Sequence, residues 1–333
     1  MSHPKLSLIY SLHVSQNIGL VLAQLTNLTL LLLIWKKASD KFGTYRYLMA
    51  IFAIYSVMFT WTELVVQPIM YTEAPVFAIM ADSRIRHNVA LGQFLVALYC
   101  GTFALCISLL ACHFVYRYLI VCKPEFHMNG YKLMYILSPC PVFFLIWFSL
   151  VYFGMEGTTK KIAPFKATVL EHYSMNIDEI AFAALAYWYK DENGEQKWNL
   201  KSVFSLAGFD AIIGSCVSVI FICGVSIFRD LKQKASLMSE VKMDFQKQLL
   251  VTLTIQTLVP FCLMYMTVGF IITTPLLSVD LGVYANIPGV ALAVYPCIEP
   301  CVAIVCIRDF RRAFKVWKQP SVTPSSRYTS DAV

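Results

Sequence analysis

The sequence predicts an all-α membrane protein, a bundle of seven membrane-spanning helices with its N-terminus outside the cell. The first observation is composition: 58% of the 333 residues are hydrophobic and only 14% are charged, whereas a soluble globular protein is roughly a quarter charged and about half apolar. The second is pattern, because the apolar residues form long runs separated by short polar segments. The third is an uneven distribution of Lys and Arg between the two sides of these runs. We therefore interpret residues 1–333 as one membrane domain.

Seven runs are long enough to cross the hydrocarbon core as helices. A crossing takes about 20 apolar residues, and in a helix every backbone polar group bonds within its own segment. The expected spans cover residues 12–34, 46–70, 89–117, 133–154, 201–228, 248–273 and 283–307.

The basic residues set the expected orientation, because loops rich in Lys and Arg stay on the cytoplasmic side during insertion. The first, third and fifth connections and the tail at 308–333 carry 18 of the 27 Lys and Arg residues. More than half of those on the other side belong to one long loop, 155–199, where the rule is weak. The tail is therefore expected inside the cell, and the protein in the plasma membrane.

The net charge of +7 and the eleven cysteines could each suggest another class of protein. The basic residues lie between apolar runs, so nucleic acid is not an expected partner. The cysteines lie in or beside these runs, where a free thiol behaves as a small apolar group, and no zinc-ligand spacing occurs. We expect no metal site, no cofactor and no disulfide. No phosphate loop, His-Glu-x-x-His motif or nucleophile elbow occurs, so an enzyme is not expected.

The loop 155–199 is too long for a simple connection. Residues 180–189 form an apolar run too short to cross a membrane, and Asn193-Gly194 behind it is a strong hairpin-turn signal. We expect a β-hairpin that covers one end of the bundle. The alternative is an irregular loop that buries Trp188 and Trp198 at the lipid interface.

The third span ends in His113, Tyr116, Arg117 and Tyr118, within the sequence HFVYRY. His113 and Arg117 lie one turn apart on the same helical face. An Arg flanked by aromatic residues at the membrane rim is able to change partners between conformational states. The alternative is an Arg that snorkels to lipid head groups.

The seventh span ends in Tyr295, Pro296, Glu299 and Pro300. The two prolines remove backbone donors and so predict a hinge. Glu299 is expected near the inner face, where an acid can find water or a basic partner.

Two further segments are given structural interpretations. In residues 308–318, Phe310, Phe314 and Trp317 share one face opposite basic residues, which predicts a short amphipathic helix on the anionic inner leaflet. The triplet Asn27-Leu28-Thr29 matches a glycosylation site but lies inside the first span, so Asn27 is expected to be structural.

Six residues are expected to face inward in the outer half of the bundle, at a depth where a small ligand could bind. An acid at mid-membrane depth is costly unless it faces the bundle interior, which singles out Asp210; the alternative is an acid satisfied by Ser or Tyr neighbours. Small-molecule pockets are mostly apolar with a few placed polar groups. The six candidates are Gln93, Tyr99, Phe103, Asp210, Tyr265 and Asn286.

Several short motifs occur together and in order: GTYRYLM at 43–49, PIM at 68–70, HFVYRY at 113–118 with CKP at 122–124, NG at 193–194, QKQL at 246–249 with QTLVP at 256–260, YP at 295–296 and IRDFRR at 307–312. Together they resemble the Str class of nematode serpentine chemoreceptors, which contains the worm receptor for diacetyl. The likeness covers about residues 40 to 318.

The resemblance implies a G-protein-coupled (GPCR-like) olfactory-type receptor in the cilia of sensory neurons. The expected partners are a small odorant or metabolite, a heterotrimeric G protein and the lipid bilayer. Whether the receptor forms a homo-oligomer is left open. Glu299 departs from the Asp common in the family, and the loop 155–199 has no cysteine, so the lid must be held by packing and hydrogen bonds. The expected G-protein switch residues are His113, Tyr116, Arg117, Tyr118, Tyr295, Pro296, Glu299 and Pro300.

Three other functions compete with the receptor interpretation. A seven-helix transporter would carry repeated, broken helices around a midplane site, and the sequence shows no internal repeat. A ligand-gated channel subunit of the inverted insect-receptor kind would place the N-terminus inside, against the charge distribution. A receptor-like protein that has lost signalling is the third alternative.

Overall fold

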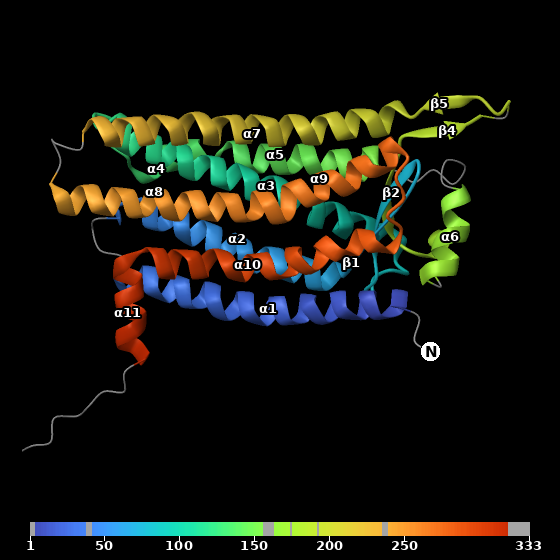
Figure 1. Cartoon of the computed structure of the whole chain (residues 1–333), viewed down its shortest axis with the longest axis horizontal. Helices are drawn as coiled ribbons and strands as arrows, with labels where there is room; N and C mark the ends of the chain where they lie inside the picture. Colours follow the sequence, from blue (N-terminus) through green and yellow to red (C-terminus); the bar gives the residue numbers. More distant parts are fainter. Residues whose placement is uncertain are drawn as a thin grey trace, which may run out of the picture.

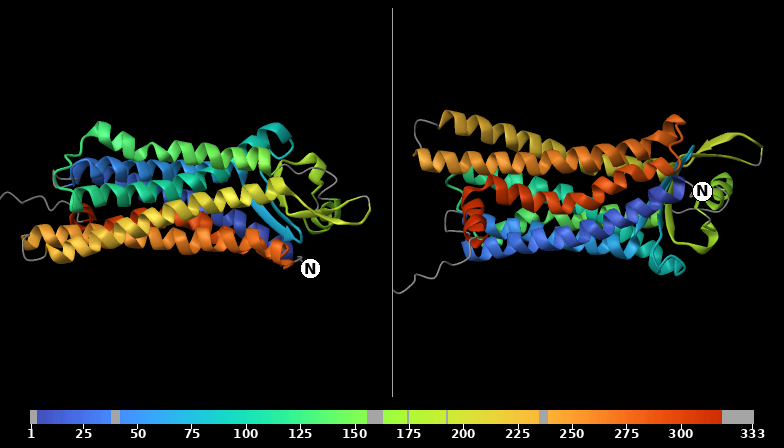
Figure 2. Two further views of the ribbon diagram at one scale, coloured as in Figure 1. Left: turned by 90° about the horizontal axis from the view of Figure 1, so that it is seen from above. Right: turned by 60° about the horizontal axis from the view of Figure 1, so that its bottom comes forward.

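The computed structural model describes residues 4–37, 42–155, 163–173, 175–191, 193–234 and 239–318. Within these residues, seven helical segments are long and apolar enough to cross a membrane, which confirms the predicted class. The segments run along the long axis of the molecule, and all the labelled strands gather at one end (Figure 1). Figure 2 shows the same separation from two other directions. We call the strand-bearing end the lid end and the opposite end the basic end.

Four of the seven spans are single helices, and three are composite. The single helices are α1 (Pro4–Lys37), α2 (Tyr45–Val66), α3 (Val89–Cys122) and α7 (Leu200–Gln233). Span four consists of α4 (Gly130–Leu137), α5 (Pro139–Ser149) and the π-helical turn η2 (Leu150–Gly154). Span six consists of α8 (Glu240–Pro260), the π-helical turn η4 (Phe261–Tyr265), α9 (Met266–Thr273) and the 3₁₀ turn η5 (Thr274–Leu277). Span seven consists of the 3₁₀ turn η6 (Val283–Asn286) and α10 (Ile287–Cys306).

Proline accounts for two of the breaks in the composite spans, because it lacks the backbone N–H that continues a helix. Pro139 begins α5, and the hydroxyl of Ser138 donates to the carbonyl oxygen of Tyr135 at 2.8 Å, which satisfies an acceptor that Pro139 cannot reach. Pro260 ends α8, and the wider π turn follows directly. Both sites lie within otherwise continuous apolar segments.

Helix α2 ends four residues earlier than the expected span 46–70. Pro68 disfavours the helical conformation of the residue before it, and Gln67 adopts a left-handed conformation with φ of 46°. Its N–H donates to the carbonyl oxygen of Glu63 at 2.7 Å and so caps the helix. Residues 68–70 are therefore strand, and their assignment to the second span is corrected.

A three-stranded antiparallel sheet, here called the lid sheet, covers the lid end. It consists of β1 (Pro68–Glu73), β2 (Val76–Ala81) and β3 (Phe182–Ala186), in the order β1-β2-β3. The register pairs Pro68 with Ala81 and Val76 with Ala186. The sheet thus joins the connection after span two to the loop after span four, a pairing that the sequence analysis did not anticipate.

The predicted hairpin in the loop 155–199 is present, but the lid sheet, not the hairpin, covers the end of the bundle. Strands β4 (Trp188–Lys190) and β5 (Gln196–Trp198) pair antiparallel, with Trp188 opposite Trp198. Gly194 in the turn has φ of 81°, a conformation that costs glycine little. The hairpin projects beyond the bundle at the lid end (Figure 1). The same loop also contains α6 (Ala163–Tyr173) and the 3₁₀ turn η3 (Ile177–Glu179).

Hydrogen bonds to the spans hold the lid sheet in place. The N–H of Ala184 donates to the carbonyl oxygen of Met155, and the hydroxyl of Tyr187 donates to that of Ile272 at 2.7 Å. On the other edge, Thr72 forms an isolated bridge with Gly282. All eleven cysteines are free thiols, so these bonds and packing hold the described lid.

The outer surfaces of the spans are apolar, as a lipid environment requires. Large exposed side chains include Leu25 on α1, Phe221 on α7 and Phe270 on α9. Helix α11 (Arg308–Lys318) follows span seven and turns sharply away from the bundle axis (Figure 1). The predicted helix after span seven is thus present; the side chains of Phe314 and Trp317 lie outside the described residues.

Candidate functional site

A small cavity of about 50 Å³ lies directly beneath the lid sheet. Sites for drug-sized ligands have volumes of about 300–1,000 Å³, so this cavity suits a molecule with few heavy atoms. Its wall combines strands of the lid sheet with four of the spans. The lining residues are Met70, Phe77, Ile79, Tyr99, Cys100, Phe103, Trp147, Val151, Met155, Phe209, Val268 and Ile272.

Aromatic rings form much of the cavity wall and fix one another's positions. Tyr99 and Phe103 on α3 pack edge to face with ring centroids 5.6 Å apart, and Phe59 on α2 contacts both. On the other side, the rings of Trp147 and Phe209 lie 4.4 Å apart. Such pairs prefer specific geometries and stabilise beyond their buried area. The cavity is therefore a preformed apolar site with few polar groups.

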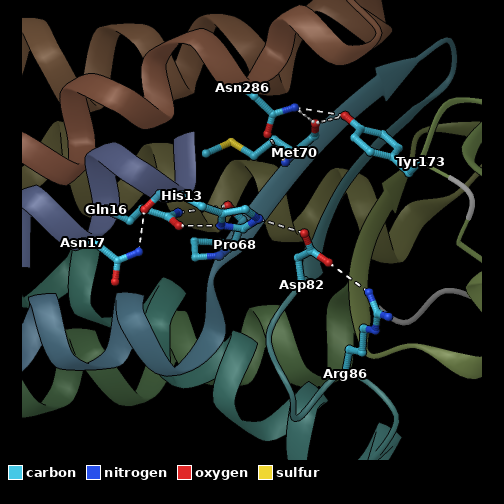
Figure 3. Close-up of polar contacts among 9 residues, drawn as sticks. All are labelled: His13, Gln16, Asn17, Pro68, Met70, Asp82, Arg86, Tyr173 and Asn286. Atoms are coloured by element: carbon cyan, nitrogen blue, oxygen red, sulfur yellow. Dashed lines mark hydrogen bonds and ion pairs between the residues drawn. The ribbon is translucent and has the colours of Figure 1, made fainter. Parts of the chain in front are cut away.

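Asn286 at the start of span seven holds strand β1, which carries one cavity wall (Figure 3). Its Nδ2 donates to the carbonyl oxygen of Met70 at 2.7 Å, and the N–H of Met70 donates to its Oδ1 at 2.8 Å. The hydroxyl of Tyr173 on α6 donates to the same carbonyl oxygen and accepts from Asn286 Nδ2 at 2.9 Å. Burial raises the pKa of Tyr173, so its hydroxyl stays protonated as a donor. The side chain of Met70 is thereby fixed against the cavity.

A second polar cluster joins α1 to the connection between β2 and α3 (Figure 3). The Nε2 atom of His13 lies 2.8 Å from Oδ2 of Asp82, whose Oδ1 accepts from Arg86 Nη1 at 3.1 Å. Gln16 donates weakly to the carbonyl oxygen of Pro68 at 3.5 Å. This cluster anchors the N-terminal part of α1 to the start of β1 and the end of β2, which lie side by side.

The structure brings together some of the six ligand-binding candidates. Tyr99 and Phe103 line the cavity. Tyr265 lies behind it, because its hydroxyl donates to the carbonyl oxygen of Phe103 at 2.8 Å, and Asn286 acts on the cavity through Met70 as described above.

Two candidates lie elsewhere. Gln93 is half-buried on α3 and does not line the cavity. Asp210 is exposed on α7, so the expectation that it faces the bundle interior is not met in this structure. The neighbouring Phe209 occupies the inward position instead.

Sequence reasoning missed the cavity residues contributed by the lid sheet, Phe77 and Ile79. A signal for them exists, since residues 76–81 form a six-residue apolar run bounded by Pro75 and Asp82, which is typical of a buried strand. Trp147 and Phe209 gave no such signal, because they lie in helices that are apolar on every side.

At the basic end, Arg117 on α3 joins span three to span six. Its Nη2 donates to Oε1 of Gln246 on α8, and its guanidinium carbon lies 5.8 Å from the ring centroid of Tyr45. Only 2% of Arg117 is exposed, and its Nε has no hydrogen-bond partner among the described residues. A buried Arg with an unused donor is able to gain partners in a different arrangement of helices.

Two of the other predicted residues of this region lie near Arg117. The ring of His113 packs edge to face against Tyr45, with centroids 5.6 Å apart. The hydroxyl of Tyr116 lies 2.9 Å from that of Thr44 at the start of α2. Tyr118 is half-buried and packs elsewhere, against a cluster that includes Ile227 on α7. The structure therefore gathers His113, Tyr116 and Arg117 around the end of α2.

The proline-containing part of α10 faces the bundle interior. Glu299 accepts a hydrogen bond from Nε2 of Gln256 on α8, and its second carboxylate oxygen has no partner among the described residues. The hydroxyl of Tyr295 lies 3.5 Å from Sγ of Cys106 on α3. Span seven is thus joined to spans three and six by polar contacts of Tyr295 and Glu299.

Asn27 on α1 compensates for the second proline of this segment. Pro300 has no N–H, so the carbonyl oxygen of Pro296, four residues earlier, lacks its usual helical donor. Nδ2 of Asn27 donates to that oxygen at 2.9 Å. The side chain is fully buried, in agreement with the structural role expected for it.

Comparisons with known proteins identify relatives over nearly the whole chain. The family model described as serpentine type 7TM GPCR chemoreceptor Str matches residues 12–315. Serpentine receptor class r-10 of Caenorhabditis briggsae is 30% identical over 320 residues, covering 94% of this chain and 93% of the relative. The protein of the same name from Caenorhabditis elegans is 30% identical over 318 residues, with the same coverage. G-protein coupled receptor str-33 of Caenorhabditis elegans is 26% identical over 296 residues, covering 87% and 86%.

Proposed function

Because this chain belongs to the Str family of serpentine seven-transmembrane chemoreceptors, we propose that it binds a small, weakly polar molecule beneath the lid sheet and activates a heterotrimeric G protein at its basic end. The chain is a multi-pass membrane protein of a chemosensory GPCR family. We further propose that the ligand binds in the cavity beneath the lid sheet, that the G protein binds at the basic end, and that the receptor acts in the cilium of a sensory neuron.

One observation carries the proposal: spans three and six contact each other beside the cavity and again at the basic end. Beneath the lid sheet, Tyr265 donates to the carbonyl oxygen of Phe103, beside the cavity. At the basic end, Arg117 donates to Gln246. A ligand that displaces α9 at the cavity would act on the same span that Gln246 belongs to, with Pro260 between the two contacts as a hinge.

The proposed switch is a shift between two arrangements of these spans. A ligand shifts such an equilibrium only if it binds one arrangement more tightly. Arg117, His113 and Glu299 each keep a buried polar atom without a partner in the described structure, and burying such an atom costs free energy. An arrangement in which the G protein or neighbouring helices supply these partners would therefore recover this free energy.

The test is second-messenger output from cells that express the receptor with a promiscuous G protein, challenged with a panel of small volatile and water-soluble metabolites. We expect a response that needs both the G protein and Arg117. The control is Arg84→Ala, which alters an exposed Arg at the opposite end of the molecule. If Arg117→Ala receptors reach the surface and signal fully, the proposed switch is wrong.

Orientation is tested separately with an epitope at the N-terminus. We expect antibody to label unpermeabilised cells, because the N-terminal end of α1 lies at the lid end, which the proposal places outside the cell. Labelling only after permeabilisation would support the inverted channel subunit instead.

A further inference from the structure

A second and larger cavity lies on the flank of the bundle near the basic end, away from the lid sheet. It has a volume of about 570 Å³ and is bounded by α3, by both halves of span four and by α7. Several of its lining side chains, including Tyr135, Pro139, Ser215 and Val219, are exposed. The cavity is therefore a cleft that opens on the outer surface of the spans, where lipid surrounds them.

The cleft is hollow because its walls are built from small residues. Ser108, Ala111 and Cys112 face it from α3, and Ser215 and Cys216 face it from α7. Small residues usually let membrane helices approach closely, but here the helices leave a space between them.

The polar atoms of these walls are already in use. The hydroxyl of Ser108 donates to the carbonyl oxygen of Ala104 at 2.7 Å, and that of Ser215 donates to the carbonyl oxygen of Ile212 at 2.9 Å. Sγ of Cys112 donates to the carbonyl oxygen of Ile136 at 2.9 Å. The walls are thus suited to a hydrocarbon chain rather than to a polar molecule.

The mouth of the cleft carries a positive charge. Nζ of Lys132 donates to the carbonyl oxygen of His127 at 2.8 Å and lies 4.3 Å from the ring centroid of Phe126. No acidic side chain among the described residues forms an ion pair with Lys132. The exposed rings of Tyr131 and Tyr135 stand beside it, 5.2 Å apart, and tyrosine is typical of the membrane interface.

We propose that this cleft is a binding site for an anionic phospholipid of the cytoplasmic leaflet. One acyl chain lies in the apolar part between α3, α5 and α7, and the phosphate group lies at Lys132. Charge complementarity favours this occupant, because the cytoplasmic leaflet is the anionic one and basic pockets between spans on that side bind anionic head groups. The cleft is distinct from the cavity beneath the lid sheet and shares none of its lining residues.

A lipid in the cleft would contact α3 close to Arg117, the central residue of the proposed signalling switch. Val115, two residues before Arg117, lines the cleft on α3. An acyl chain there would contact α3, span four and α7 together, so its binding depends on the arrangement of the three. The lipid would therefore stabilise the arrangement in which the cleft is open.

The site is tested by lipid binding to the purified full-length receptor in phosphatidylcholine nanodiscs. The probe is phosphatidylserine with the same acyl chains, and bound lipid is counted by native mass spectrometry. Lys132→Gln is expected to lower the preference for phosphatidylserine over phosphatidylcholine about fivefold, the effect of one basic residue near an anionic surface. Lys123→Gln, an exposed residue of the same connection outside the cleft, is the matched control.

A second pair of variants tests the acyl-chain site. Ser215→Leu fills the cleft from α7 and is expected to remove the tightly bound lipid altogether. Ser218→Leu is the control, because Ser218 is exposed on the same helix, bonds its own backbone in the same way and does not line the cleft.

Two results would overturn the proposal. One is that each variant behaves as its control does. The other is that a sterol displaces phosphatidylserine from the wild-type receptor without any effect of Lys132→Gln, which would identify an uncharged occupant. Neither readout requires a ligand or a G protein, so the result is independent of the proposed signalling function.

Discussion

Asn286 and Met70 pair through two hydrogen bonds, in which the side-chain amide of Asn286 meets the backbone N–H and carbonyl groups of Met70 as a neighbouring β-strand would. The two residues are 216 positions apart in the chain. Span seven therefore supplies the outer edge partner of the lid sheet at this position, and a side chain performs a role that backbone usually performs.

We expect Asn286→Ala to lower the free energy of unfolding by about 2 kcal/mol or more, because two buried backbone groups of Met70 lose their partners at once. The measurement is the thermal inactivation midpoint of the purified receptor in detergent. Asn17→Ala is the matched control, since Asn17 is exposed on α1 and, within the described part of the chain, bonds the carbonyl oxygen of His13 in its own helix. Equal midpoints for the two variants would contradict the role assigned to Asn286.

Filling the cavity beneath the lid sheet should abolish the response to a small ligand. Cys100→Phe places a large ring at a lining position of a space of only about 50 Å³. Cys262→Phe makes the same change at an exposed position of span six outside the cavity. With any activating compound in hand, the concentration for half-maximal response is compared for both. A full response from Cys100→Phe would place the ligand elsewhere.

Gln246→Ala should raise signalling in the absence of ligand, because it releases span six from Arg117. A hydrogen bond to a charged group contributes about 1.5–3 kcal/mol, so the ratio of the alternative to the resting arrangement would rise about tenfold or more. Basal second-messenger output, normalised to surface receptor, is the measurement. Gln233→Ala, an exposed position at the end of α7, provides the comparison; no difference between the two would argue against a restraining role.

Asn27 and Pro300 should be energetically coupled, although they do not bond each other. Asn27→Ala leaves the carbonyl oxygen of Pro296 buried without a donor, at a cost of about 1–3 kcal/mol. Pro300→Ala restores a backbone N–H that can reach that oxygen, so the same Asn27→Ala change should cost about 1 kcal/mol less in this background. Thermal midpoints of the four proteins test this cycle, and additive effects would refute it.

The hairpin tip should be insensitive to pH near neutrality and lose stability in acid. Lys197 Nζ lies 2.6 Å from Asp191 Oδ2, and this hydrogen bond lowers the pKa of Asp191 and raises that of Lys197. The contribution of Asp191 is present above its ordinary pKa of about 3.9 and is lost as pH falls through the lowered value. That of Lys197 is present below about 10.4 and is lost as pH rises through the raised value.

Amide hydrogen exchange of residues 188–198 measures this dependence. Protection, corrected for the intrinsic exchange rate, should be constant between about pH 5 and 9 and decline at lower pH. In Asp191→Asn the decline on the acid side should be absent. A decline in the variant equal to that of the wild type would assign it to another group.

The seven spans and the β4–β5 hairpin could be predicted because their signals are local. A long apolar run and the Asn193-Gly194 turn each carry enough information within a short window. The lid sheet could not be predicted in the same way, since β2 is buried by pairing with β3, about a hundred residues further along the chain. The run 76–81 is apolar for that reason. Residues 68–70 were assigned to the end of a span because their partner strand could not be recognised.

The direction of individual side chains was harder to predict than the spans themselves. Helix α7 is apolar on nearly every side, so its sequence does not indicate its rotation, and Asp210 was expected inside although Phe209 lies there. Arg117 and Glu299 stand out in the sequence, because a charged group in an apolar segment restricts its own position, and both are buried. Glu299 bonds Gln256 instead of the water or basic partner expected for it. Their partners, Gln246 and Gln256, are uncharged and gave no comparable signal.

The bridge between Thr72 and Gly282 can form only late in synthesis of the receptor. Strand β1 enters the membrane system with the second span, yet its last partner is synthesised only after the sixth. During synthesis strand β1 therefore remains without its last partner while most of the chain emerges. Completion of the lid sheet thus reports that span seven is in place, and a receptor truncated before it would present unpaired strand edges to the quality-control machinery of the cell.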